Sequence, residues 1–560
     1  MAGPFRSTPW LLALLLLAPG AGVRGQSSPD VPPLDPAYGD LAVLLSRGWS
    51  LGLLAGQGPH SRMAFARAVA HARAAAAGGT SPVAPRVTEA LRRLEATFAD
   101  ELALLCSPPG GAAPPPEACP TPERKLTLRR TSVSAHAMDA PPRAIPTRYL
   151  SRDSIGGEKL DADVSPFLED AQGRWVDPEG WTLGGEAAVE GTLGRRLSGS
   201  VHPRIAVSDP TGAGTRFQGT LQEGYVRASV ANLAITVGRA YAPIGYARSY
   251  GPLISQNARA LDQIRISVDE LSRLPWIFSA LGPARGALWV ADLGSDRDIP
   301  GSKLIGMQGT IRPHPNLELG ATLLNQQFGE GAPPASWGER IRDFFFMASR
   351  RFLPFEDPGE FSDKVLAANA RLAVPGVGAH VYVDFMTTDD HNLFRSPADG
   401  FGNNAAWTVG AARTAFGPEG RLDAWVEGTT AGVRAYTHHQ FTSGMTLDRR
   451  VLGSPLGPLG SGLRGGVAWE GPSDRVEVEG ALERYDGDLY QETGARRTWE
   501  RIEEHPAEVR LRGTLTWARR PLPLGVLTTF RLGYEDVRRF GFTEASRKNL
   551  LGQVTVSYTW

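Results

Sequence analysis

The chain has 560 residues, with 59 Lys and Arg against 59 Asp and Glu, so its formal net charge is zero. This balance lacks the basic bias of nucleic-acid-binding proteins, and we expect no nucleic-acid partner. The 65 Gly and 44 Pro residues are typical of a chain rich in turns. Mean hydropathy is −0.21, which is compatible with a membrane barrel because half of each strand faces a polar lumen.

The first 25 residues are typical of a secretory signal peptide. Arg6 supplies the positive start, Trp10–Ala18 is a short apolar core, and a cut after Gly25 would leave Gln26 first. Beyond this segment there is no run of about 20 apolar residues that could cross a membrane as a helix. If the mature chain enters a membrane, it must therefore do so as closed β-strands.

Residues 26–106 are predicted to form a small helical module. Ser61–Ala77 is rich in Ala, and Asp40–Ala55 is a weaker helix interrupted by Gly48 and Gly52. Arg86–Cys106 carries an apolar stripe at steps of three and four residues: Val87, Leu91, Leu94, Phe98, Leu102 and Leu105. We interpret the three helices as a periplasmic cap rather than a catalytic domain.

Residues 107–123 form a linker rich in Pro, Gly and Ala, which is the clearest domain boundary in the chain. Cys106 and Cys119 are the two cysteines, and in an exported protein such a close pair is expected to form a disulfide. A metal site would need further Cys or His at ligand spacing, and neither cysteine has such neighbours. We expect neither a metal nor a cofactor.

From residue 124 to the end, apolar and polar side chains alternate in segment after segment. In the last of these, Val554, Val556, Tyr558 and Trp560 alternate with polar residues. Such alternation over about ten residues predicts a tilted strand that crosses a membrane. A soluble β-sandwich also alternates, but tryptophans near the segment ends favour an interfacial girdle. These are Trp181, Trp289, Trp407, Trp469, Trp517 and Trp560.

Connection lengths predict the topology independently, because periplasmic turns of such barrels are short and extracellular loops are long. If Trp560 is periplasmic, the short links on its side are 194–196, 231–232, 312–316, 375–378, 416–420, 471–474 and 518–524. The long links on the opposite side are 208–218, 241–260, 327–364, 387–405, 431–462, 485–506 and 536–549. Residues 270–285 would be a longer periplasmic excursion.

Residues 124–560 are therefore predicted to form an antiparallel transmembrane β-barrel of about 18 strands, an even number as such barrels require. The first strand is placed near Lys125–Ser134. The fold class is mainly β, with the helical module at the N-terminus.

Three blocks of loop sequence follow one another in a recognisable order. They are Val237–Arg239 with Gly251–Arg259, Leu317–Gly320 with Gly329–Pro333, and Tyr436–Thr446 with Val451–Gly457. Together they resemble the Wzi-type capsule-assembly proteins over most of residues 165–560. The resemblance implies an outer-membrane barrel that binds surface or capsular polysaccharide and helps assemble or anchor it. Its implied partners are outer-membrane lipid, the polysaccharide and polysaccharide-export machinery.

Saccharide binding needs aromatic faces for sugar rings and planar groups for hydroxyls and carboxylates. The candidate ligands in and before the loop at 241–260 are Arg239, Tyr241, Tyr246, Arg248, Tyr250, Asn257 and Arg259. Those in later loops are Trp337, Tyr436, His438 and Arg449. The alternative is that these loops fold inward and plug the barrel, and for 241–260 the two interpretations have equal weight.

Two other classes of function stay open. A porin or export channel would need an open lumen. However, a glutamate row at 477, 479 and 483 facing arginines at 510 and 512 predicts a charge-paired lumen wall.

An outer-membrane hydrolase is the second alternative. Asp389, Asp390 and His391 could support acid–base chemistry, but no hydrolase signature accompanies them, and we expect no enzyme activity. His438 and His439 are not expected to share a metal ion, because neighbouring residues on a strand point to opposite faces.

Overall fold

The computed structural model describes residues 26–49, 52–78, 83–105, 124–145, 149–150, 160, 162–210, 214–352, 361–388, 397–493, 498–520 and 525–560. The expected signal peptide, the expected linker with its cysteine pair Cys106 and Cys119, and the group Asp389, Asp390 and His391 lie outside these residues.

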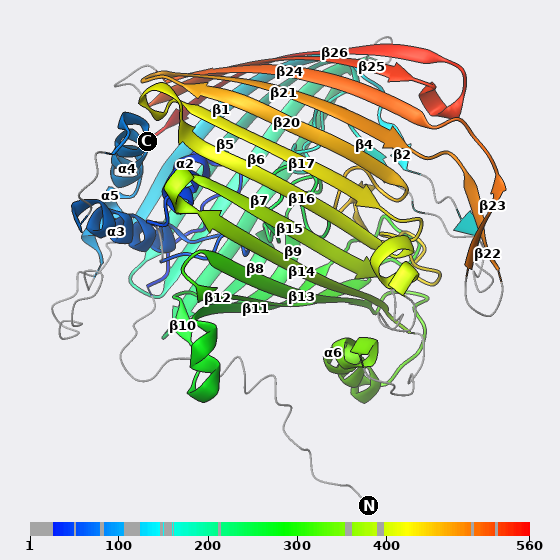
Figure 1. Cartoon of the computed structure of the whole chain (residues 1–560), viewed down its shortest axis with the longest axis horizontal. Coiled ribbons are helices and arrows are strands. Elements are labelled where there is room, and N and C mark those ends of the chain that lie inside the picture. Colours follow the sequence, from blue (N-terminus) through cyan, green and yellow to red (C-terminus); the bar gives the residue numbers. More distant parts are fainter. Residues whose placement is uncertain are drawn as a thin grey trace, which may run out of the picture.

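Eighteen antiparallel strands close into a single barrel, as the sequence predicted (Figure 1). Strand β26 (Ser546–Thr559) pairs with β1 (Lys125–Asp139), which closes the ring and leaves no free edge, as lipid requires. Between them the wall consists of β5 (Glu179–Leu193), β6 (Leu197–Pro210), β7 (Arg216–Val230), β8 (Leu233–Ala240), β9 (Leu261–Val268), β11 (Pro283–Asp292), β12 (Lys303–His314), β13 (Leu317–Gln327), β14 (Asp363–Val374), β15 (Ala379–Thr388), β16 (Ala405–Phe416), β17 (Leu422–Ala431), β20 (Gly460–Glu470), β21 (Asp474–Tyr485), β24 (Glu508–Arg519) and β25 (Val526–Arg538).

The apolar side of the wall faces outward. On β24, Leu511 and Leu515 are exposed, whereas Arg510 and Arg512 are buried in the interior. On β26, Val554 and Val556 are likewise exposed. This arrangement is the inverse of a soluble sandwich, and it is what a wall surrounded by lipid requires.

The predicted short links that fall within the described residues lie at the end of the barrel that carries Trp560, which we call the turn end; the opposite end is the loop end (Figure 1). The helices α2 (Ala37–Ser46), α3 (Arg62–Gly78), α4 (Pro85–Thr97) and α5 (Ala99–Ala103) cover the turn end. Helix α2 ends well before the expected Ala55, because Gly48 adopts a left-handed φ of 72° and turns the chain.

Several strands are longer than predicted. The link expected at 536–549 shrinks to 539–545, and the one expected at 208–218 shrinks to 211–215. The first strand continues to Asp139 rather than Ser134. Strand pairing continues beyond the lipid band into water, where both faces can be polar, so the alternation ends before the strand does.

Further elements lie in the loops. Helix α6 (Trp337–Phe352) lies outside the barrel wall, and the hairpin of β22 (Leu489–Thr493) and β23 (Thr498–Glu503) projects from the loop end (Figure 1). Smaller elements are β2 (Arg143–Ile145), β3 (Tyr149–Leu150), β4 (Ala162–Val164), β10 (Ser272–Arg273), η2 (Trp276–Leu281), η3 (Pro375–Val377), η4 (Asp399–Asn403), η5 (Pro418–Gly420), β18 (Thr446–Leu447), β19 (Arg450–Val451) and η6 (Phe540–Phe542). Among the helices within the described ranges, we find none with the length and hydropathy of a transmembrane helix.

Candidate functional site

The N-terminal segment, residues 26–49 and 52–61, enters the barrel lumen from the turn end. Asp30 accepts hydrogen bonds from Arg227 Nη1 at 2.9 Å and from Arg265 Nη2 at 3.0 Å, and both arginines belong to the wall. His60 Nδ1 lies 2.8 Å from Arg285 Nη1. Burial and the charge of Arg285 lower the pKa of His60 well below its usual value, so the neutral ring accepts this hydrogen bond.

Asp40 of α2 ties the helices together. Its carboxylate accepts hydrogen bonds from Arg93 Nε at 2.8 Å and Arg86 Nη1 at 3.0 Å, both in α4. Burial opposes ionisation, but the hydrogen bond and charge of Arg93, helped by Arg86, hold the pKa of Asp40 below its usual value. Glu470 of β20 lies 3.3 Å from Arg93 Nη2, so the helical module is also fastened to the wall.

The loop 241–260 enters the lumen from the loop end and meets the N-terminal segment. The backbone N–H of Gly245 donates to the carbonyl of Gly56 at 3.2 Å. The N–H groups of Tyr246 and Ala247 donate to Asp384 Oδ2 of the wall at 2.8 and 2.7 Å. A Cβ at position 56 would lie 2.6 Å from the ring of Tyr246, so this close approach depends on glycine.

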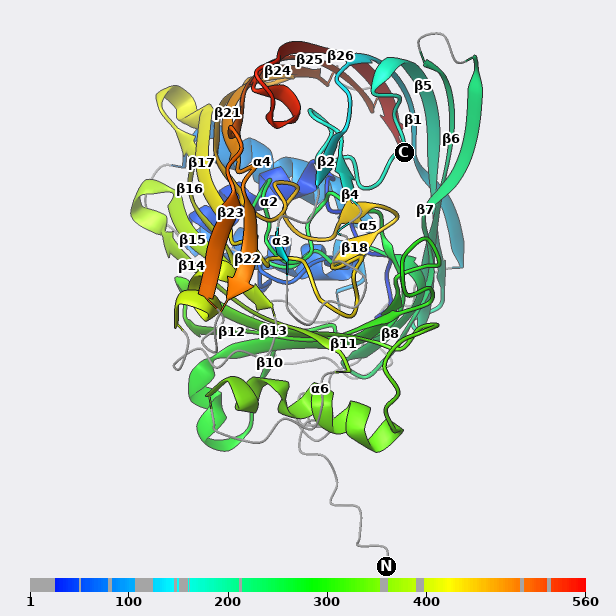
Figure 2. The same ribbon diagram turned by 90° about the vertical axis from the view of Figure 1, so that its right-hand side faces the viewer.

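Residues 432–459 cover that loop. Ser255 N–H donates to the carbonyl of Leu452 at 2.8 Å, and Asn257 Nδ2 donates to the carbonyl of Val451 at 2.8 Å. Apolar side chains of the two loops form a core inside the barrel: Ile244, Leu253, Ile254, Met445, Leu447, Val451 and Leu452. We call residues 26–49, 52–61, 241–260 and 432–459 the lumen plug, and Figure 2 shows its loops within the ring of strands.

Charged residues of the wall pair inside the lumen, beside the plug. Glu483 accepts hydrogen bonds from Arg512 Nη2 at 2.6 Å and from the Tyr250 hydroxyl at 2.5 Å. Glu169 accepts from Arg512 Nη1 at 2.8 Å and from Arg464 Nη1 at 3.1 Å. Of the predicted pairs, Glu483 with Arg512 is present, whereas Glu477 and Glu479 pair with Arg475 and Arg464. Protein fills the lumen from both ends.

Five of the eleven predicted saccharide ligands are buried in the plug. They are Tyr241, Tyr250, Asn257, Tyr436 and His438. Tyr436 Oη accepts a hydrogen bond from Ser454 N–H at 3.2 Å, and half-buried Tyr246 donates through its hydroxyl to Glu318 at 3.3 Å. These contacts support the inward-folding alternative, and a role of these residues in sugar binding stays a prediction.

Two predicted arginines form an ion-pair chain at the loop end. Arg239 donates to both oxygens of Asp262, at 2.8 and 2.9 Å. Arg259 Nη1 donates to Asp262 at 3.0 Å, and Arg259 also binds Asp448. These ion pairs join strands β8 and β9 of the wall to the loop 432–459. Both arginines therefore have a structural role.

Arg248 and Arg449 keep access to solvent, since each side chain is 46% exposed. Arg248 Nη2 donates to Glu477 at 2.5 Å, and Arg449 Nη2 donates to Asp163 at 2.9 Å. Trp337 lies apart from both, on α6 outside the barrel. The structure therefore does not gather the predicted ligands into one site.

A polar hollow of about 450 Å³ lies at the rim of the loop end, beside the β22–β23 hairpin. It is lined by Arg484, Asp486, Asp488, Arg501, Glu504, His505, Pro506, Ala507, Val509 and Arg539. Asp488 accepts from Arg501 Nη1 at 3.0 Å and from His505 N–H at 2.8 Å. The sequence analysis predicts only a long link at 485–506 and misses the hairpin. The strand-like segments on either side of residues 494–497 are the pattern that indicates it.

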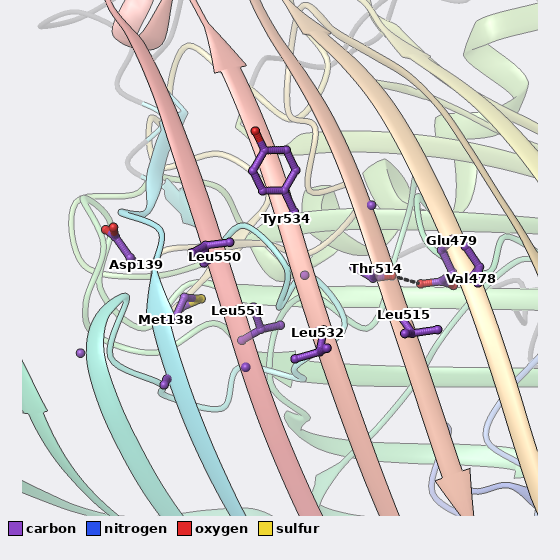
Figure 3. A pocket seen from close by; sticks show the side chains of 15 residues that line it. Met138, Asp139, Val478, Glu479, Thr514, Leu515, Leu532, Tyr534, Leu550 and Leu551 are labelled. Atoms are coloured by element: carbon purple, nitrogen blue, oxygen red, sulfur yellow. Dashed lines mark hydrogen bonds between the residues drawn. The ribbon is translucent and has the colours of Figure 1, made fainter.

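A larger hollow of about 920 Å³ lies on the wall formed by β21, β24, β25, β26, β1 and β5 (Figure 3). Its outward side chains are apolar except for Asp139 at its edge, and Leu532 and Leu550 are 60% and 59% exposed. Gly513 and Gly552 face outward and have no side chains, which leaves the space of the hollow between the neighbouring apolar side chains. Apolar side chains offer little to sugar hydroxyls, so this hollow suits lipid rather than saccharide.

His438 and His439 lie in a loop and not, as expected, on a strand, so their side chains do not point to opposite faces. Their ring centroids are 4.5 Å apart. Within the described ranges, no group of three or more His, Cys, Asp or Glu side chains has the arrangement of a metal site.

The model of the family described as capsule assembly protein Wzi matches residues 163–479. Among solved structures, Wzi of Escherichia coli is 16% identical over 96% of this chain and 100% of that chain, with a TM-score of 0.61. That protein is described as an outer-membrane protein involved in group 1 capsule assembly and as a carbohydrate-binding β-barrel. At this identity the likeness establishes the fold alone.

Other solved structures are less similar. OprD of Pseudomonas aeruginosa is 10% identical over 78% of this chain and 95% of that chain, with a TM-score of 0.40. OccAB1 of Acinetobacter baumannii is 9% identical over 76% of this chain and 96% of that chain, with a TM-score of 0.41. These scores are too low to support an inference. No curated protein matches the chain by sequence.

Proposed function

Because this chain belongs to the Wzi capsule-assembly family, we propose that it binds capsular or other surface polysaccharide and helps to hold it at the cell surface. It does so without catalysis. The barrel with its outward apolar wall sits in the outer membrane. The loop end faces the cell exterior and the helices at the turn end face the periplasm.

The observation that carries this proposal is the filled lumen. The N-terminal segment and the loop 241–260 meet inside the barrel, where Gly245 N–H binds the carbonyl of Gly56. A porin or an export channel needs a continuous water path, and buried ion pairs between the N-terminal segment and the wall, such as Asp30–Arg227, occupy the place where it would run. A long polymer can therefore bind to the surface of the loop end but cannot pass through the barrel.

The polar hollow beside the β22–β23 hairpin is the part of that surface best suited to saccharide. Its volume of about 450 Å³ lies within the range of small-ligand sites. Arginine guanidinium groups can bind sugar carboxylates in a bidentate manner, and the carboxylates of Asp486 and Glu504 can accept from hydroxyls. Exposed Arg449 extends the polar surface of the loop end.

Polysaccharide-export machinery is the proposed partner at the turn end. The helices there cover the barrel on the side from which a polymer would be delivered. They do not block the hollow, which lies at the opposite end.

Deletion of the gene in an encapsulated strain tests the proposed function directly. We expect less cell-attached polysaccharide and more in the medium, with total synthesis unchanged. Complementation with the intact gene should restore attachment. Unchanged attachment would contradict the proposal and leave the barrel fold unaffected.

A further inference from the structure

Helix α6 begins with a capping box and is attached to two strands of the wall. Ser336 and Glu339 form a capping box: Ser336 N–H donates to Glu339 Oε2 at 2.7 Å, and Glu339 N–H donates to Ser336 Oγ at 3.3 Å. Asp343 is fully buried, lies 3.3 Å from Lys364 Nζ, and accepts from Asn325 Nδ2 at 2.9 Å. The helix is therefore fixed to β13 and β14 near the loop end.

The wall beneath α6 is the outward, lipid-facing side of the barrel. Phe344 is buried against outward side chains of four neighbouring strands: Leu288, Ile305, Met307, Leu323 and Leu366. Figure 2 shows α6 outside the ring of strands, along β11, β12 and β13. A helix in this position has membrane around it wherever the wall does not cover it.

The uncovered side of α6 is apolar. Trp337 and Ile341 are 72% and 46% exposed and lie one turn apart, whereas Asp343 is buried on another side of the helix. Arg342, also exposed, lies about 100° around the helix axis from Ile341. An aromatic residue, an aliphatic residue and a neighbouring cation form the pattern of a helix that lies in a membrane interface.

A second exposed apolar segment lies under the same part of the wall at the turn end. In η2, Trp276 and Ile277 are 80% and 81% exposed. Strand β12 runs between the two segments over 12 residues. At about 3.3 Å per residue and a tilt of about 40°, it spans roughly 30 Å along the membrane normal, slightly more than the apolar band of about 25 Å. The two segments therefore lie at opposite boundaries of the band.

We propose that α6 is an interfacial helix that binds the leaflet at the loop end, at the boundary between acyl chains and phosphate-bearing head groups. Trp337 and Ile341 enter the acyl region, and Arg342 meets lipid phosphate. With η2 at the other boundary, α6 fixes the depth and tilt of the barrel. Trp337 thus serves lipid rather than saccharide. A membrane is favoured over a second protein copy because the exposed face is continuous with the lipid-facing wall.

Spin labelling in vesicles tests this proposal. A nitroxide is attached to Ile341→Cys in the full mature chain carrying Cys106→Ser and Cys119→Ser, in vesicles of phosphatidylcholine and phosphatidylglycerol. We expect collision with oxygen to exceed collision with a water-soluble nickel chelate severalfold, as at the wall control Val409→Cys. The control Glu330→Cys, exposed in the same loop, should show the opposite preference.

Two outcomes would overturn the proposal. One is a nickel-accessible label at position 341, matching Glu330→Cys. The other is strong dipolar broadening at position 341, which would mean that a second copy covers this face. If Ile341→Cys does not fold, Trp337→Cys on the same face gives the same readout. Saccharide binding is not measured here, so the result is independent of the proposed function.

Discussion

Asp30 shows how a single carboxylate holds the plug. It pairs with Arg227 and Arg265, whose side chains are 1% and 5% exposed. Two buried guanidinium groups need a partner, because an unpaired buried charge is far more costly than an unpaired exposed one. The sequence of the N-terminal segment does not alternate between apolar and polar residues, so its position in the lumen could not be predicted from such a pattern. Asp30 helps to fix that position because its charge complements the arginines of the wall.

Asp30→Asn is expected to loosen this segment. It leaves the two buried arginines without one of their negative partners, which should lower the free energy of unfolding by about 3 kcal/mol. The measurements are thermal unfolding in detergent and the rate of tryptic cleavage in residues 26–61. Asp100→Asn is the control, because its pair with Lys125 is exposed and worth little. Equal effects of the two substitutions would contradict the argument.

His60 predicts a pH dependence. Its pKa is lowered well below 6.5 in the folded chain, by burial first and by Arg285 second. Unfolding restores the usual pKa, so the unfolded state binds an extra proton as pH falls below about 6.5, and stability is lost by up to about 1.4 kcal/mol per pH unit. Above that pH the residue contributes no pH dependence.

His60→Gln should flatten this decline, because glutamine can still accept from Arg285 but does not titrate. Unfolding temperatures between pH 7.5 and about pH 5 measure the slope. The exposed His314→Gln at the same end serves as the matched control and should keep the slope of the original chain. A slope that is the same for His60→Gln and the original chain would rule out His60 as its source.

At the scale of elements, the strands were predictable and the loop elements were not. A strand in lipid has one compulsory apolar face, so its sequence repeats every second residue. Helix α6 and the β22–β23 hairpin lie where water, wall and lipid meet. Their side chains face several environments, so their apolar residues follow no single sequence period. The sequence placed Trp337 in an outer loop but could not show that this loop folds back on the wall.

The hollow beside the β22–β23 hairpin gives the prediction at this scale. Arg484→Ala is expected to weaken binding of purified polysaccharide fragments severalfold, because Arg484 lines the hollow and is charged. Titration calorimetry on the detergent-solubilised protein measures the affinity. Arg538→Ala is the control: it lies on the outward side of β25, is exposed, and does not line the hollow. Equal affinities of the two variants would move the site elsewhere.

At the scale of the whole molecule, the barrel is closed in two senses. The sheet closes through β1 and β26, and the lumen closes because loops and the N-terminal segment meet inside it. The first closure follows from the absence of sheet edges in lipid. The closure of the lumen blocks a barrel that could otherwise conduct ions, and leaves the surface of its loop end for binding.

The intact protein is accordingly expected to show no steady conductance in planar bilayers. Replacement of residues 243–258 by a short Gly-Ser link should produce a measurable channel, because it removes the part of the plug that meets Gly56. Heat-modifiable migration in gels checks that the shortened barrel still folds. Steady conductance of the intact protein would contradict the closed lumen.

The sequence by itself determined the barrel, the approximate strand number and the grouping of short turns with Trp560, since lipid imposes a period of two on every strand. It also suggested the pairing of Glu483 with Arg512. Only the tertiary structure decided that Tyr250, Asn257 and Tyr436 turn inward, and that a polar hollow forms beside a hairpin. A loop has no such periodic constraint, and its course depends on partners hundreds of residues away.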